Sequence, residues 1–175
     1  HLIEFLIGEK LKSVAADLST FVEGRKLDDD ASILLRMTNN IKGNLSISQV
    51  ATGEENNFKI SIYGEKGALH WHQENPNYAT LSKIGLADQI ITRAGYIQKK
   101  GSLASTRIPP GHPEGYLEAF AQIYSDVADV ILNRENKSDL LNILPSVNDG
   151  LHIMRFINAC VDSSLNNSKW TDLST

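Results

Sequence analysis

The sequence changes character abruptly over one stretch, residues 107–120. Short segments that alternate between apolar and polar residues precede it, and longer segments with helical periodicity follow it. Pro109, Pro110 and Pro113 keep a helix from starting before about Glu114, because proline lacks a backbone donor and restricts the residue before it. The chain must therefore fold as a run of strands followed by a run of helices.

Alternation predicts the strands of the first part. The clearer candidates are 11–22, 31–38, 42–51, 57–63 and 68–74, and the weaker ones are 78–84 and 89–93. The turn sequences Asn39-Asn40-Ile41 and Gly64-Glu65-Lys66-Gly67 predict hairpins between neighbouring strands. The polar segment 95–106 is predicted to be a mobile loop.

Two apolar stripes predict long helices, over 114–133 and from Pro145 and Ser146 to about Leu165. A helix-like pattern also opens the chain and stops at Gly8. Because that pattern starts without a cap, we expect the chain to be a fragment of a longer protein. Trp170 and Leu173 are expected to pack back on the body.

This order of elements predicts an α+β fold, a single domain over residues 1–175. We expect an open-faced, mostly antiparallel sheet of about six to seven strands with helices packed on one face. The other face of such a sheet is left uncovered. Self-association through that face would bury it, so a homo-oligomer is expected.

Composition excludes several classes of protein. A net charge of −4 argues against a nucleic-acid partner, since phosphate binding requires clustered Lys and Arg. No apolar run approaches the roughly 20 residues that span a bilayer, so no membrane partner is expected. The single cysteine, Cys160, lies within the second predicted helix and is expected to be packed there. One cysteine also suits a reducing compartment and predicts a cytoplasmic location.

The sequence contains no convincing metal or nucleotide motif. His70, His72 and Glu74 share one face of a predicted strand, as metal ligands would, but polar residues of an edge strand share a face in the same way. The aspartates at 28–30 lack the spacing of an EF-hand loop. Gly64 and Gly67 lie in a hairpin rather than between a strand and a helix, which excludes a phosphate loop. No metal is expected.

Two polar clusters could serve a site. One surrounds Glu54 and Asn56, and the other combines His112 with Glu114 and Tyr116 at the start of the predicted helix. Neither cluster contains a complete catalytic set. The residues alone leave two interpretations open, a contact surface for a sugar-sized polar ligand or a stiff connector with solvated side chains.

Several segments resemble one known family, and they occur in the order that the family has. They are residues 16–30, residues 48–67 with their Ile-Tyr-Gly-Glu-Lys-Gly end, residues 111–120 (Gly-His-Pro-Glu-Gly-Tyr-Leu-Glu-Ala-Phe), Asp149-Gly150 and residues 170–173 (Trp-Thr-Asp-Leu). On these segments the chain resembles the C-terminal domain of the Gfo/Idh/MocA superfamily, the glucose–fructose oxidoreductase and inositol dehydrogenase relatives. The resemblance runs over essentially the whole sequence.

The resemblance implies a NAD(P)-dependent oxidoreductase acting on a sugar, inositol or related polyol. It implies that an N-terminal Rossmann domain, outside this chain, binds NAD or NADP and that residues 1–175 wall the substrate pocket and form a dimer or tetramer. It also implies hydride transfer with a proton shuttle outside the chain, so the fragment alone is expected to be inactive. The alternative is a non-catalytic domain that only mediates assembly.

The resemblance also implies roles for individual residues. His112 is the first choice for a substrate contact, followed by Asn56, which matches a frequent family asparagine. Glu54, which stands where many relatives carry histidine, is a further predicted substrate contact. Tyr116 is predicted to serve both the site and the core, and its place on the apolar stripe favours the core. His1 lies closer to Gly8 than the family's motif histidine does, which places that histidine upstream. No catalytic, cofactor-binding or metal-ligating residue is therefore expected within the chain.

Overall fold

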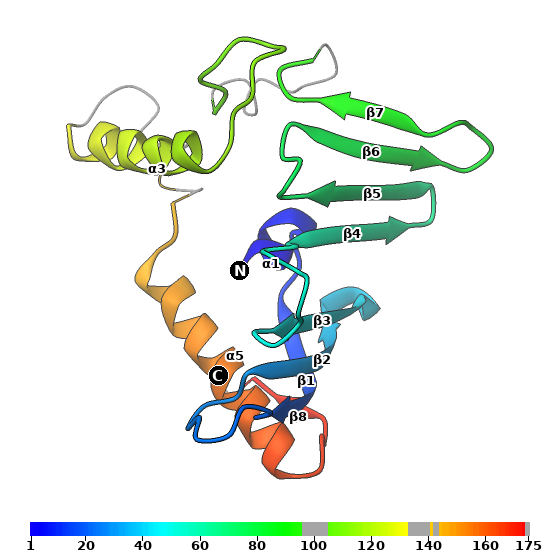
Figure 1. The fold of residues 1–175 in the computed structure, drawn as a ribbon, viewed down its shortest axis with the longest axis vertical. Coiled ribbons are helices and arrows are strands. Elements are labelled where there is room, and N and C mark those ends of the chain that lie inside the picture. Colours follow the sequence, from blue (N-terminus) through cyan, green and yellow to red (C-terminus); the bar gives the residue numbers. More distant parts are fainter. Residues whose placement is uncertain (96–104, 133–140, 142–143, 174–175) are drawn as a thin grey trace. The chain divides into compact units, whose positions relative to one another are not determined.

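The computed structural model describes residues 1–95, 105–132, 141 and 144–173 (Figure 1). The chain divides into two compact units. Unit 1 comprises His1–Gly53 and Pro145–Thr175, and unit 2 comprises Glu54–Leu144. Among the described residues, each unit contains one antiparallel sheet of four strands.

The sheet of unit 1 has the strand order β3-β2-β1-β8. Its strands are β1 (Leu11–Ser19), β2 (Asp30–Met37), β3 (Lys42–Ser48) and β8 (Thr171–Asp172). The predicted hairpin between β2 and β3 is confirmed, and a single 3₁₀ turn (Thr38–Asn40) closes it. Asn39 and Asn40 have φ angles of 53° and 59°, a left-handed conformation that asparagine tolerates better than most residues.

Helices cover one face of this sheet. Along β2, every second residue is buried: Ala31, Ile33, Leu35 and Met37. Residues Ala159 and Cys160 of α5 (Val147–Leu165) pack against this face, and Ile3 of α1 (Leu2–Ile7) adds to the same core. Leu34, on the other face of β2, is 54% exposed. The open-faced arrangement that the sequence predicted is therefore confirmed in unit 1.

Helix α5 begins and packs as its sequence predicts. The Ser146 side chain caps it in a reciprocal pair with Asp149, whose pKa is lowered first by the Ser146 hydroxyl and then by the Ser146 N–H. Further along, the hydroxyl of Ser163 accepts a hydrogen bond from the N–H of Ala16 (2.9 Å) and donates one to the carbonyl of Lys169 (2.7 Å). Burial raises the pKa of the Cys160 thiol to about 11, which agrees with its predicted packing role.

Asp29 stabilises the turn between β1 and β2. Its buried carboxylate accepts hydrogen bonds from the N–H groups of Phe21 (2.8 Å) and Val22 (3.1 Å) and pairs with Arg25 (3.1 Å). The Phe21 N–H is the main reason that the pKa of Asp29 lies below its usual 3.8; burial opposes this shift, while the Val22 N–H and Arg25 reinforce it. The acidic segment therefore closes a turn.

We expect this carboxylate to make the protein acid-sensitive. A lowered folded-state pKa contributes stability above the ordinary value of 3.8, and this stability is lost as pH falls through the folded pKa. Asp29→Asn should therefore reduce the free energy of unfolding at pH 7, and its difference from wild type should shrink between about pH 5 and about pH 2. Asp28→Asn, at the exposed neighbour, is the matched control and should leave the pH profile unchanged. A difference that stayed constant with pH would contradict this role.

Unit 2 contains a meander in which each strand pairs with the next (Figure 1). Its strands are β4 (Lys59–Gly64), β5 (Gly67–His72), β6 (Tyr78–Lys83) and β7 (Gln89–Thr92). Cross-strand register places Ile60, Trp71, Ala79 and Ile91 side by side on one face. The predicted hairpin turn at Glu65 and Lys66 is confirmed.

The helix after the prolines is α3 (Tyr116–Ile131). It starts two residues later than predicted because Gly115 is its N-cap, and the Glu118 carboxylate accepts from the Gly115 N–H at 2.9 Å. That N–H is the main cause of a lowered pKa for Glu118. Most of the predicted loop 95–106 and the link that follows the helix lie outside the described residues.

The α+β class and the antiparallel pairing are confirmed, with one correction. The described strands form two sheets of four, where the sequence predicted one sheet of about six to seven. The break falls between β3 and β4, in a segment where Gly53 (φ 95°) and Asn57 (φ 45°) adopt left-handed backbone conformations that a continuous strand does not contain. Within the described ranges, no helix is long and apolar enough to cross a membrane.

Candidate functional site

The stretch where strands give way to helices is held by a partly buried ion pair in unit 2. Arg93, just after β7, lies 2.8 Å from the Glu114 carboxylate, measured from Nη1 to Oε2. Their side chains are only 16% and 9% exposed. Asn77, just before β6, joins both: its Oδ1 accepts from Arg93 Nε (2.8 Å), and its Nδ2 donates to the Glu114 carbonyl (3.0 Å). We call Arg93, Glu114 and Asn77 the Arg93–Glu114 clamp.

The clamp fixes the backbone of the proline-rich stretch. The Arg93 guanidinium donates to the carbonyls of Ile108 (2.8 Å) and His112 (2.7 Å). The Glu114 carboxylate accepts from the N–H groups of Arg107 (3.1 Å) and Ile108 (2.9 Å). Because charged partners strengthen each of these hydrogen bonds, the stretch is tied firmly to the ends of β6 and β7.

The clamp presents His112 at the surface. The His112 backbone is anchored through its carbonyl, while the residue itself is exposed. Tyr116, at the first turn of α3, is 67% exposed, and its ring lies 4.8 Å from that of Phe120. The expectation that Tyr116 belongs to the core is therefore not met within the described residues, because its ring is exposed and lies tilted against that of Phe120. Both side chains are available to a ligand.

The second polar cluster is anchored at the end of β5. Glu54 and Asn56 are exposed, and the N–H groups of Asn56 and Asn57 hydrogen-bond to the Glu74 carboxylate. The Asn57 N–H, at 2.8 Å, is the main reason that the pKa of Glu74 lies below its usual 4.5. Glu74 therefore orders the loop that carries Asn56.

A metal site on β5 is not formed. His70 Nδ1 lies 3.0 Å from the Ser61 hydroxyl, and His72 Nε2 lies 3.6 Å from Glu74. Within the part of the chain that the structure describes, no group of three or more His, Cys, Asp or Glu side chains could hold a metal ion. Instead, the Ser61 hydroxyl is the partner of His70, and His72 Nε2 is buried with no hydrogen-bond partner among the described residues.

The four predicted contacts, Glu54, Asn56, His112 and Tyr116, all fall in unit 2. Two separate networks position them: Glu74 orders the loop of Asn56, and the Arg93–Glu114 clamp holds His112. His1 lies in unit 1, at the N-cap of α1, 3.9 Å from Asp149. The exposed imidazole, amide and phenol groups can hydrogen-bond a polar ligand.

Arg93 and Asn77 were missed by sequence reasoning. Arg93 ends a weak strand, and Asn77 follows Pro76 in a turn. Neither residue belongs to an apolar pattern of a strand or helix. Their contacts with Glu114 also could not be predicted, because they depend on where the chain returns after the loop that follows β7. The one sequence signal that could have identified Arg93 is its charge at the end of a predicted strand.

Comparisons with known proteins find one family model and several oxidoreductases that the chain resembles. The model of the GFO/IDH/MocA C-terminal domain matches residues 1–70. The uncharacterized oxidoreductase YfiI of Bacillus subtilis strain 168 is 30% identical over 167 residues, which are 93% of this chain and 42% of YfiI. The chain thus spans less than half the length of that relative.

Solved structures extend the similarity to nearly the whole chain. An oxidoreductase from Sinorhizobium meliloti is 42% identical, with a TM-score of 0.89 over 95% of this chain and 48% of its own. An inositol dehydrogenase homologue from Azotobacter vinelandii, solved with NADH and myo-inositol, is 28% identical. Its TM-score is 0.86 over 98% of this chain and 46% of its own.

Proposed function

Because the chain belongs to the Gfo/Idh/MocA family, as one of its C-terminal domains, we propose that it is the substrate-binding and oligomerisation part of a NAD(P)-dependent dehydrogenase. The observation that carries this proposal is the likeness, over 98% of the chain, to an inositol dehydrogenase homologue solved with NADH and myo-inositol. The proposed substrate is a sugar, inositol or related polyol. The proposed location is the cytoplasm, on the ground of the single buried thiol.

The exposed polar groups of unit 2 suit a polyol. His112, Asn56 and Glu54 offer both donors and acceptors, as neighbouring hydroxyl groups require. The Tyr116 and Phe120 rings of α3 supply an exposed apolar surface. In this proposal the Arg93–Glu114 clamp sets the position of His112, and Glu74 sets that of the Asn56 loop.

The described residues do not fit a dinucleotide. A nucleotide fold places a glycine-rich turn between a parallel strand and a helix, whereas every strand pair described here is antiparallel. Gly64 and Gly67 flank a hairpin turn. We therefore propose that NAD or NADP is bound by residues outside this chain. Tight binding of either dinucleotide by the 175 residues alone would contradict the proposal.

His112→Ala in the full-length enzyme tests the substrate contact. Losing one hydrogen bond to a polyol should raise KM about two- to thirteenfold, since such bonds contribute about 0.5–1.5 kcal/mol. Steady-state kinetics over several polyols measures the effect. Tyr124→Phe, at a 73% exposed ring further along α3, is the control and should leave KM unchanged. If kcat and KM stayed at wild-type values for every polyol, the proposed contact between His112 and the substrate would be contradicted.

The second candidate function is assembly alone, and the uncovered face of the unit 1 sheet favours it. That face carries Leu34 at 54% exposure, with the exposed Asn44 paired beside it on β3, whereas Ala15, paired with Leu34 on β1, is buried. We propose that a second copy of the chain covers this face, giving a dimer or tetramer. If the chain serves only assembly, His112→Ala should leave kcat and KM unchanged and the oligomer intact. A monomer in a size measurement would contradict the assembly proposal.

A further inference from the structure

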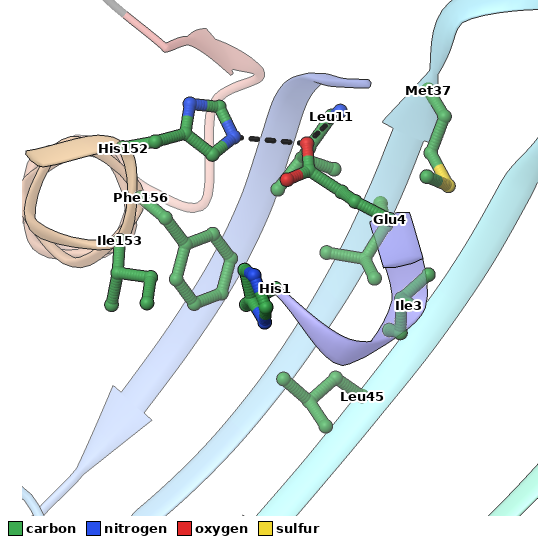
Figure 2. Close-up of a pocket in the computed structure, with 10 residues that line it drawn as sticks. His1, Ile3, Glu4, Leu11, Met37, Leu45, His152, Ile153 and Phe156 are labelled. Atoms are coloured by element: carbon green, nitrogen blue, oxygen red, sulfur yellow. Dashed lines mark hydrogen bonds and ion pairs between the residues drawn. The ribbon is translucent and has the colours of Figure 1, made fainter. Parts of the chain in front are cut away.

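A pocket of about 210 Å³ lies in unit 1, between α1, α5 and the covered face of the sheet (Figure 2). Apolar side chains form most of its wall: Ile3, Met37, Leu45, Ile153 and Phe156. An apolar cavity of about 150 Å³ in another protein holds benzene, so this volume accommodates one ring with a substituent. The pocket residues belong to unit 1, whereas the proposed polyol contacts belong to unit 2.

The polar part of the wall consists of Glu4, which is its charged side chain, and of the imidazoles of His1 and His152. The Glu4 side chain is 10% exposed, and its Oε1 accepts hydrogen bonds from the Leu11 N–H (2.7 Å) and from His152 Nε2 (2.9 Å), as Figure 2 shows. Its other oxygen, Oε2, has a long ion pair with Lys10 (3.9 Å), whose side chain is 72% exposed. Among the described residues, Oε2 accepts no hydrogen bond. An ionised oxygen beside an apolar pocket gains most from a donor that enters that pocket.

We propose that this pocket binds a small apolar molecule, the size of one substituted ring, that carries a hydroxyl donor for Glu4 Oε2. A carboxylate ligand would be repelled by Glu4. An ammonium ligand would have to shed its hydration beside a carboxylate that already faces His152 and Lys10. A hydroxyl group loses less hydration free energy on entering the pocket than either charged group, and it can donate a hydrogen bond to Glu4 Oε2. The class is therefore a monocyclic alcohol, and the inference does not depend on the dehydrogenase proposal.

Two isomeric probes test this inference in the unaltered protein. Benzyl alcohol and anisole have the same formula, but only benzyl alcohol donates a hydrogen bond. We expect NMR titration to give saturable binding of benzyl alcohol with a Kd on the order of 1 mM. Anisole should bind at least about threefold more weakly, and benzoate should not bind. A wholly apolar pocket would prefer the more hydrophobic anisole. Tighter binding of anisole than of benzyl alcohol, or binding of benzyl alcohol that does not saturate, would overturn the inference.

Variants place the binding in the pocket. Glu4→Gln keeps an acceptor for Leu11 and His152 but puts an amide donor where Oε2 was, so the preference for benzyl alcohol over anisole should disappear. Leu45→Phe fills the pocket and should abolish the binding of both probes. Leu86→Phe, the same change at a 63% exposed position, should bind both as wild type does. Binding that survives Leu45→Phe in a folded protein would also overturn the inference, as binding at another surface.

Discussion

Arg93→Ala is expected to destabilise the protein by about 3 kcal/mol or more. The change leaves the Glu114 carboxylate, whose side chain is 9% exposed, without its cation. It also removes the donors that hold the carbonyls of Ile108 and His112. Denaturant unfolding monitored by circular dichroism measures the loss. Arg93→Lys should recover part of it, because an ammonium keeps the charge but cannot donate to several fixed acceptors at once.

Arg36→Ala is the matched control for this change. Arg36 stacks on the ring of Trp170, 3.8 Å from its centroid, and the residue is exposed. Its removal should reduce the free energy of unfolding by only about 0.5–1 kcal/mol. Equal losses for the two arginines would show that the Arg93–Glu114 clamp does not hold the proline-rich stretch.

Leu35→Ala is the second large effect and is expected to reduce the free energy of unfolding by about 2–5 kcal/mol. Leu35 is 3% exposed and belongs to the core between the unit 1 sheet and α5. Truncating it removes apolar contacts and enlarges the cavity beside it. Equilibrium unfolding in urea measures the change.

Leu34→Ala is the control one residue away, on the opposite face of the same strand. Its side chain is 54% exposed in the chain by itself, so its truncation should change the free energy of unfolding by less than about 1 kcal/mol. Comparable losses at the two positions would contradict a sheet that is covered by helices on one face alone.

Local patterns predicted most of the fold. Alternation in 31–38 matches β2 because a half-buried strand must place every second residue in the core, as Ile33 and Leu35 show. The apolar stripe of α5 and its Ser146 cap depend on contacts within a few residues, so they can be read directly from the sequence. The Asn39-Asn40 turn was predictable for the same reason.

Features that depend on long-range pairing were not predictable. β8 consists of two residues, Thr171 and Asp172, and pairs with β1 from the far end of the chain. Its existence depends on where α5 returns the tail. The division into two sheets likewise depends on whether β3 and β4 pair, which the polar segment between them does not reveal.

The candidate site was predictable in part. The prolines identified the stretch that presents His112, since they restrict the backbone locally. The residues that hold it, Arg93 and Asn77, come from strand ends distant in the sequence. The Glu4–His152 pair of the unit 1 pocket joins residues 148 positions apart, so no spacing rule could have found it.

The most direct test of the proposed function is the absorbance of reduced nicotinamide when the full-length protein meets NAD or NADP and a panel of inositols, sugars and other polyols. We expect reduced nicotinamide to accumulate with at least one polyol, and His112→Ala to raise the KM for that polyol. The proposal would be contradicted if the folded full-length protein reduced neither NAD nor NADP with any polyol and also failed to oxidise NADH and NADPH with the corresponding ketones.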